Sequence, residues 1–401
     1  MGSAPLAASP ELKPRRAGLP RMQEMGLVVV IVLLSLFLWL GSDNVERVVK
    51  EKQVKNAAGQ VVQTLPEMTV RENKFFRTAN LVPSVFTVMS WMAIMALGAT
   101  VVIIAGGIDI SVGSIMGLAA LGCAAAIQNM PENASAWRVL PVALAAPLGI
   151  GLLCGFINGA IVIWLRMHPF IVTLATMSIF RWGCLKWVKE GSLPYGDRSL
   201  PDAFTDHFIA WEVHYRKYGG RVVESLQPMP MILMLVCMVL VWMYLQFMVW
   251  GRETYAVGGN EEASRFSGIR VQWAKMRVYL ISGLCAGIAG MISCGFYKSA
   301  ATNTGEGYEL MVIAAAVVGG ASLTGGRGTA LGAVLGMLVI QLISNGISVL
   351  RPINLGFTML PVSTEDTKLI VGIAIIVAVA VDQLSAYFQR RQMALRRILL
   401  K

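Results

Sequence analysis

Two glycine-rich segments with small polar side chains interrupt long apolar runs, and they are the first candidates for chemistry in this chain. They read AGGIDISVGSIMG at 105–117 and VGGASLTGGRGTALG at 318–332. Aligned on their glycine pairs, they also agree at a following hydroxyl residue and a following glycine. Such a pattern permits an unwound backbone at membrane depth, which in many transporters lines a substrate path. Close packing of helices through small residues is the structural alternative.

Asp109 is an acid within the first of these segments. A carboxylate at membrane depth costs free energy and commonly marks a functional site. The simpler interpretation is a local one, in which Asp109 caps the helix expected from Ser111 onward. Contact with a substrate is the second interpretation. Proton coupling is the least favoured, because no chain of intramembrane acids or histidines accompanies Asp109.

Other polar residues in the apolar runs could face a path for a hydroxylated solute. Asn158 and Asn345 are each followed by glycine, and an Asn-Gly pair after a long apolar run predicts the end of a helix more simply. The candidates for a translocation path or a broken helix are Gly106, Gly107, Asp109, Ser111, Gly113, Asn158, Thr173, Gly319, Gly320, Thr324 and Asn345.

The sequence contains no enzymatic motif. The GGRGT stretch at 325–329 lacks the lysine and the preceding strand of a nucleotide-binding P-loop. No triad or pair of catalytic carboxylates stands out, so we expect no catalytic residue and no cofactor on this chain. The six cysteines lie in or beside apolar runs and the three histidines are far apart, which argues against disulfides and a metal site.

The segment 251–270, GRETYAVGGNEEASRFSGIR, is compact, mixed in charge and punctuated by glycine. It lies between two apolar runs and predicts a short helix at 261–266. A connection between membrane helices has little reason for such order unless something docks on it. We interpret it as the place where a soluble motor subunit pushes on a membrane channel.

The composition indicates the elements that position these residues. Of 401 residues, 56% are hydrophobic and only 14% are charged, where soluble domains carry roughly a quarter. The apolar residues form runs of about the length that crosses a bilayer, which predicts an all-α polytopic membrane protein. The expected spans are 25–41, 85–105, 115–128, 140–164, 169–187, 231–250, 278–292, 310–325, 329–350 and 369–388.

The distribution of basic residues predicts the orientation. The net charge of +11 does not indicate nucleic-acid binding, because much of the lysine and arginine lies beside the spans. The short basic segments 251–277 and 390–401 then lie inside, which places both termini in the cytoplasm. The expected organisation is a tail at 1–24, one membrane domain at 25–389 and a basic tail at 390–401.

Two long segments, 43–84 and 188–228, are expected outside the membrane. The first could form a small hairpin or a surface helix. Each could be a solvated loop or a docking surface for a soluble partner, and the residues favour neither.

Several motifs together carry a family resemblance. They are GGIDISVGS at 106–114, HPFIVTLATMSIFRWG at 168–183, AVGGNEEASRFSGI at 256–269, GYELMVIAAAVVGGASLTGGRGT at 307–329 and NG at 345–346. In this order, over roughly 75–390, they resemble the permease subunits of bacterial ABC importers for monosaccharides such as ribose, xylose and galactose. The resemblance implies the type II importer fold, with about ten transmembrane helices.

The resemblance also implies partners and a location. It implies a multi-pass permease of the inner membrane, paired with a second permease subunit that is either another copy or a paralogue. A cytoplasmic ATPase would hold ATP and magnesium, and a periplasmic sugar-binding protein would deliver the solute. Residues of the segment that would couple to the ATPase are Gly258, Gly259, Asn260, Glu261, Ala263, Arg265, Ser267 and Gly268. The outer segments look longer than is usual in these permeases, which leaves the sugar open.

Other functions remain as alternatives at this point. A permease of the same architecture could import branched-chain amino acids or another small polar solute. An ion-coupled secondary transporter would need buried ionisable residues in its spans, and Asp109 is the only clear one. A membrane enzyme or scaffold would leave the segment 251–270 unexplained.

Overall fold

The computed structural model describes residues 22–49, 52–55, 61–65, 68–217, 221–350, 353–354, 359–360, 369, 372–373 and 376. The expected tails at 1–24 and 390–401 and the last expected span at 369–388 lie wholly or largely outside these residues.

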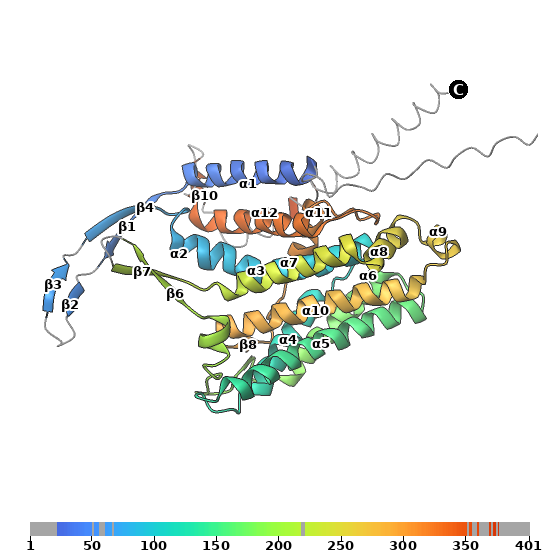
Figure 1. The fold of residues 1–401 in the computed structure, drawn as a ribbon, viewed down its shortest axis with the longest axis horizontal. Helices are drawn as coiled ribbons and strands as arrows, with labels where there is room; N and C mark the ends of the chain where they lie inside the picture. Colours follow the sequence, from blue (N-terminus) through green and yellow to red (C-terminus); the bar gives the residue numbers. More distant parts are fainter. Residues whose placement is uncertain are drawn as a thin grey trace, which may run out of the picture.

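Long helices that run side by side form most of the described chain (Figure 1). Among the described residues, five helical stretches are long and apolar enough to cross a membrane: Glu24–Gly41, Leu81–Ile104, Ala136–Trp164, Met229–Phe247 and Val271–Tyr297. The helices are α1 (Met22–Gly41), α2 (Thr78–Asn80), the π-helix η1 (Leu81–Thr87), α3 (Val88–Ile104), α4 (Val112–Ile127), α5 (Ala136–Trp164), α6 (Pro169–Trp187), the π-helix η2 (Thr205–Ile209), α7 (Met229–Phe247), α8 (Val249–Gly259), α9 (Glu261–Phe266), α10 (Val271–Tyr297), α11 (Tyr308–Val318) and α12 (Ala330–Val349).

These helices confirm the expected helical membrane architecture. Every expected span that falls among the described residues overlaps a helix, and α6 matches the span 169–187 residue for residue. The span expected at 310–325 is wrong beyond Val318, where α11 ends. Gly320, Gly325 and Gly326 adopt positive φ, which a helix cannot continue through. With 11 residues, α11 is about 16 Å long, roughly half the thickness of a hydrocarbon core.

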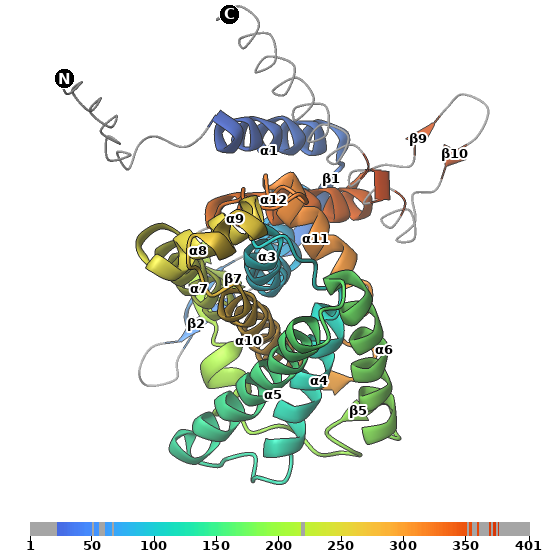
Figure 2. The same ribbon diagram turned by 90° about the vertical axis from the view of Figure 1, so that its right-hand side faces the viewer.

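Helix α10 is the centre of the bundle and packs against α3, α4 and α5 (Figure 2). Glycines allow the close approach to α5: a Cβ at Gly151 would collide with the carbonyl oxygen of Gly283, and a Cβ at Gly155 with that of Tyr279. Further along α10, Gly290 lies against the backbone of α4 in the same way. Without a hydrophobic drive between helices in lipid, such small-residue contacts supply the van der Waals packing.

The two ends of the bundle differ in structure (Figure 1). One end, here the hairpin end, carries antiparallel strand pairs, so of the two alternatives for 43–84 the structure shows the hairpin. The opposite end, here the α9 end, carries the short helix α9 and the N-terminus of α1. The strands are β1 (Asn44–Val49) with β4 (Met68–Asn73), β2 (Lys52–Lys55) with β3 (Val61–Leu65), β5 (Ser192–Leu193) with β8 (Ala300–Ala301), β6 (Val213–Lys217) with β7 (Arg221–Leu226) and β9 (Ile353–Asn354) with β10 (Met359–Leu360).

The two Asn-Gly pairs do not end helices, contrary to the sequence prediction. Asn158 lies inside α5 and Asn345 inside α12, and both side chains are buried. The amide groups of Asn345 and Asn80 exchange two hydrogen bonds of 3.0 and 2.9 Å, which join α12 to the start of η1. Tertiary hydrogen bonds and close packing thus satisfy residues that would otherwise favour a helix end.

The α5–α10 crossing yields a prediction about stability. Gly151→Ala should lower the free energy of unfolding by about 1–3 kcal/mol, because the added methyl meets the Gly283 carbonyl oxygen. Gly149→Ala on the same helix is the control, since a Cβ there has no neighbour within 4 Å. The measurement is the midpoint of thermal unfolding in mild detergent. Equal midpoints for the two variants would contradict the close contact of α5 and α10 at Gly151.

Candidate functional site

A cluster of buried polar side chains surrounds the break between α3 and α4, where residues 105–111 leave the helix. Asp109 Oδ1 accepts hydrogen bonds from the Ser111 N–H (3.0 Å) and the Ser111 hydroxyl (2.7 Å). Asp109 Oδ2 accepts from the Ser282 hydroxyl on α10 at 2.8 Å. The carboxylate therefore satisfies the start of α4 locally and also ties it to the central helix.

Two further helices reach the same break. On α5, the Asn158 amide donates to the Ser111 hydroxyl at 2.8 Å. On α6, the Thr173 hydroxyl lies 3.2 Å from the Ile108 carbonyl oxygen and 3.0 Å from that of Pro169 in its own helix, and its one proton can serve either. The structure thus brings together four residues singled out in the sequence, Asp109, Ser111, Asn158 and Thr173. An unwound backbone at membrane depth needs such partners, because lipid offers none.

Sequence reasoning missed Ser282, although it holds the other oxygen of Asp109. The available signal was a Ser-Gly pair at 282–283 inside an apolar run, followed by further glycines at 287 and 290. This pattern marks a helix that others approach closely, but it does not say which residue Ser282 meets.

Three backbone turns interlock at the α9 end of the bundle. The Gly326 N–H donates to the Ile104 carbonyl at 2.8 Å, at the end of α3. Gly258 of α8 lies against both groups, so a Cβ there would collide with the Ile104 oxygen. The Tyr255 hydroxyl of α8 donates to the Gly328 carbonyl at 2.7 Å. We call this contact of α3, α8 and the 319–329 turn the glycine junction.

A cavity of about 370 Å³ adjoins the glycine junction and links the two groups of sequence candidates. Its lining includes Gly106 and Gly107 of the first break, Thr324 of the second, and Gly258–Glu261 of the segment expected to dock a partner. Tyr279 also lines it, and its buried hydroxyl has no hydrogen-bond partner in the described part of the chain. A buried hydroxyl of this kind is available to a polar group that enters the cavity.

The short helix expected at 261–266 is confirmed as α9. Asn260 is its N-cap, and the Asn260 Oδ1 accepts from the Ala263 N–H at 2.9 Å. The Ser267 hydroxyl donates to the Ala263 carbonyl at 2.9 Å, and Gly268 turns the chain with φ +83°. The sequence from Asn260 to Gly268 therefore specifies a short helix whose start and end are both defined.

Helix α9 is braced against α10 rather than carried by a loop. Lys275 Nζ of α10 donates to Glu261 at 2.8 Å, and Arg277 of α10 pairs with Glu253 of α8. The segment 251–277 is more helical than a connecting loop, since α8 extends to Gly259 and α10 begins at Val271. These ion pairs and the buried cluster of Val257, Val271 and Ala274 hold the ends of α8 and α10 together within the segment 251–277.

Several other sequence candidates make contacts that do not involve the Asp109 cluster or α8. Gly113 packs against Gly305, and Gly319 allows α11 to approach Gly332 and Gly336 of α12. Gly320 follows with φ +93°, and Asn345 belongs to the separate pair with Asn80. Their contacts give close packing and chain reversal.

Comparisons with known proteins identify relatives over most of the chain. A family described as branched-chain amino acid transport system / permease component matches residues 81–380. The D-allose transport system permease of Escherichia coli K12 is 32% identical over 78% of this chain and 86% of its own. The ribose import permease of Escherichia coli K12 is 35% identical over 77% and 87%. The galactose/methyl galactoside import permease of Haemophilus influenzae is 31% identical over 82% and 94%.

The Asp109 cluster yields a prediction that separates charge from hydrogen bonding. Asp109→Leu should destabilise the protein by about 1–3 kcal/mol for each donor left without an acceptor, on Ser111 and Ser282. Asp109→Asn should cost much less, because its amide oxygen still accepts from Ser111 and its amide nitrogen can donate to Ser282. Thermal unfolding in mild detergent compares the two variants. A leucine variant as stable as the asparagine variant would show that the cluster does not hold the break.

Proposed function

The chain belongs to the family of transport-system permease components, and from that premise we propose that it is the membrane subunit of an ATP-driven importer of a monosaccharide. The proposal of a sugar rests on the relatives, which are permeases for D-allose, ribose and galactose and align with most of this chain. The sequence carries no P-loop, so hydrolysis of ATP and binding of magnesium are assigned to a separate subunit.

The observation that carries the proposal is the exposed surface of α9. Phe266, at its C-terminal end, is 84% exposed, although α9 itself is capped and braced by ion pairs. Glu262, Ala263 and Arg265 are exposed on the same short helix. A large apolar side chain held in the open on an ordered helix is typical of a docking contact. We assign this contact to a groove on the ATPase.

The glycine junction can transmit a movement of the docked helix α9 to the membrane domain. A displacement of α9 moves α8 and α10 with it, because Glu253 and Glu261 pair with Arg277 and Lys275. Helix α8 contacts the end of α3 and the 319–329 turn, so the movement reaches both glycine-rich breaks. In this mechanism ATP-driven closure of the motor tilts the helices between outward-open and inward-open states.

The proposal also fixes an orientation and a set of partners. The α9 end and both termini lie in the cytoplasm of a bacterium, and the hairpin end faces the periplasm across the inner membrane. A periplasmic binding protein delivers the sugar at the hairpin end. A second permease subunit, either another copy or a paralogue, completes the path. This assignment places the basic segment 251–277 inside.

Branched-chain amino acids are the second candidate solute, because the description of the matching family names them. Uptake of a labelled monosaccharide into vesicles, competed by other sugars or by leucine, distinguishes the two. An ion-coupled carrier is less well supported, since the Asp109 carboxylate already accepts three hydrogen bonds from Ser111 and Ser282.

The experiment that tests the assembly is purification of the tagged chain from its native membrane in mild detergent. We expect a stoichiometric ATPase, together with a second permease subunit. Identification of the ligand held by the matching binding protein then names the sugar. Recovery of the chain alone, under conditions that preserve a control transporter, would contradict the proposal.

The α9 contact yields a prediction about the ATPase. Phe266→Ala should reduce recovery of the ATPase with the chain by roughly tenfold, as expected for loss of an aromatic anchor at an interface. Phe76→Ala is the matched control, because Phe76 is also exposed but lies just after β4 at the hairpin end. If both variants retained the ATPase equally, α9 would not be the docking helix.

The glycine junction yields a prediction about transport. Gly258→Ala should lower solute uptake by roughly tenfold, because its methyl meets the Ile104 oxygen and the junction must open. Gly149→Ala should leave uptake near the wild-type rate, since Gly149 lies in α5 away from the junction and a Cβ there meets no described residue within 4 Å. Uptake is measured in cells that lack the wild-type chain, at matched membrane levels of each variant. Similar uptake rates for the two variants would show that transport does not depend on the glycine junction.

A further inference from the structure

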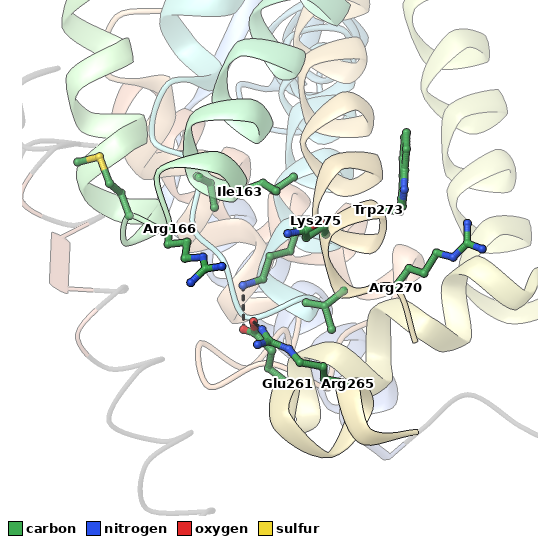
Figure 3. A pocket seen from close by; sticks show the side chains of 11 residues that line it. Ile163, Arg166, Glu261, Arg265, Arg270, Trp273 and Lys275 are labelled. Carbon is green, nitrogen blue, oxygen red and sulfur yellow. Dashed lines mark hydrogen bonds and ion pairs between the residues drawn. The ribbon is translucent and has the colours of Figure 1, made fainter. Parts of the chain in front are cut away.

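A second and larger cavity, of about 750 Å³, opens at the α9 end between α5, α9 and α10 (Figure 3). It adjoins the cavity beside the glycine junction, since Val162, Glu261 and Lys275 line both. Its walls are the last residues of α5 and the 165–168 turn, the first turns of α10, and one side of α9. The ends of two membrane-spanning helices therefore form it.

The polar lining of this cavity is strongly basic. Figure 3 shows Arg166, Arg265 and Lys275 converging on the single carboxylate of Glu261. Glu261 pairs with Lys275 at 2.8 Å and with Arg265 at 3.2 Å. Arg166 makes no hydrogen bond or ion pair with any residue that the structure describes. One carboxylate cannot neutralise three cations, so the cavity keeps an excess of positive charge.

Arg166 is held in an uncommon backbone conformation. Its φ is +51°, in the left-handed region that non-glycine residues rarely adopt. The 165–168 turn between α5 and α6 is short, so this conformation directs the guanidinium toward Lys275 and Glu261 (Figure 3). An uncommon conformation that aims a free cation into a cavity points to a ligand of opposite charge.

Arg270 and Gln272 add further polar groups, and the remaining lining residues are apolar. Val162, Ile163, Met167 and Val271 form the apolar part of the wall beside the basic side chains. Trp164, the last residue of α5, is 71% exposed, and Trp273 in the first turn of α10 is 63% exposed. Exposed tryptophans at the ends of membrane helices are typical of the headgroup region.

We propose that this pocket binds the phosphate headgroup of an anionic phospholipid from the leaflet at the α9 end. The phosphate would lie among Arg166, Arg265 and Lys275, with the glycerol and upper acyl chain against the apolar wall. Basic pockets between membrane helices have the charge and depth for such headgroups. Such a lipid site is independent of which solute the chain carries.

Two observations favour a lipid over a protein segment as the occupant. Phe266, the exposed residue that we assign to the ATPase contact, does not line the pocket. The pocket instead lies on the side of α9 that is turned toward the ends of α5 and α10. A lipid bound there would brace α9 against the membrane helices through Glu261 and its two partners.

The test measures lipid binding to the purified full-length chain by native mass spectrometry, with phosphatidylglycerol and phosphatidylcholine as probes. Wild-type protein should bind phosphatidylglycerol more tightly than phosphatidylcholine. Arg166→Gln should weaken phosphatidylglycerol binding by roughly fivefold, the contribution expected of one basic residue near an anionic membrane. Arg166→Lys should retain most of the affinity. Arg252→Gln, a basic residue of α8 outside the pocket, is the control and should bind as wild type does.

Three outcomes would overturn the proposal. The first is equal affinity of the wild-type chain for the two lipids, and the second is an equal loss in the Arg166→Gln and Arg252→Gln variants. The third is displacement of the lipid by inorganic phosphate in millimolar excess, or by a partner protein that co-purifies. Displacement by phosphate would indicate a site for a soluble anion, and displacement by protein an interface. Thermal unfolding of each variant checks that the Arg166 changes leave the fold intact.

Discussion

The hydrogen bond from the Gly326 N–H to the Ile104 carbonyl is the contact on which the arrangement of the α9 end depends. It joins the end of α3 to the turn between α11 and α12. Both groups lie against Gly258, so α8 approaches as closely as a backbone can. A side chain at Gly258 would separate all three segments. The packing of α8, and through it the position of α9, therefore follows from the absence of a Cβ at one residue.

The two breaks in the helices obey one constraint, which is that a backbone inside a membrane must find its partners within the protein. At 105–111 these partners are both backbone and side chains: the Gly106 and Gly107 N–H groups donate to carbonyls of α3, and the Ser111 N–H donates to Asp109. Side chains of α5 and α10 in turn hold Ser111 and Asp109. At 319–329 they are mostly backbone groups, including the Ser322 N–H with the Arg327 carbonyl. The similar glycine patterns thus have different solutions. The first break also draws on polar side chains of neighbouring helices, whereas the second is a turn made mostly by its own backbone, against which α8 packs.

The chain before residue 81 lies outside the family match, yet it is connected to the family's elements at both ends of the bundle. At the α9 end, the Thr329 hydroxyl donates to Glu24 of α1 at 2.8 Å and also caps α12. At the hairpin end, Asn80 pairs with Asn345 of α12, and Leu38 of α1 and Phe75 share one buried cluster with Val349 of α12. Helix α1 and the residues that follow β4 are therefore joined to α12, which makes α12 the link between this part of the chain and the shared bundle.

The sequence by itself determined the helical membrane class, most helix positions and the bounds of α6 and α9, because these follow from continuous apolar runs, Pro169, and the Asn260 cap with Gly268. Its glycine pairs also located both breaks. Only the tertiary structure decided what those residues contact. Asn158 and Asn345 stay inside helices because Ser111 and Asn80, which are distant in sequence, satisfy their side chains. Ser282 and Arg166 gained their significance from the helices that pack beside them. A short sequence pattern determines the conformation of the backbone at that position. The partner of a buried polar group depends instead on which helices pack together, and a short sequence pattern does not encode the packing.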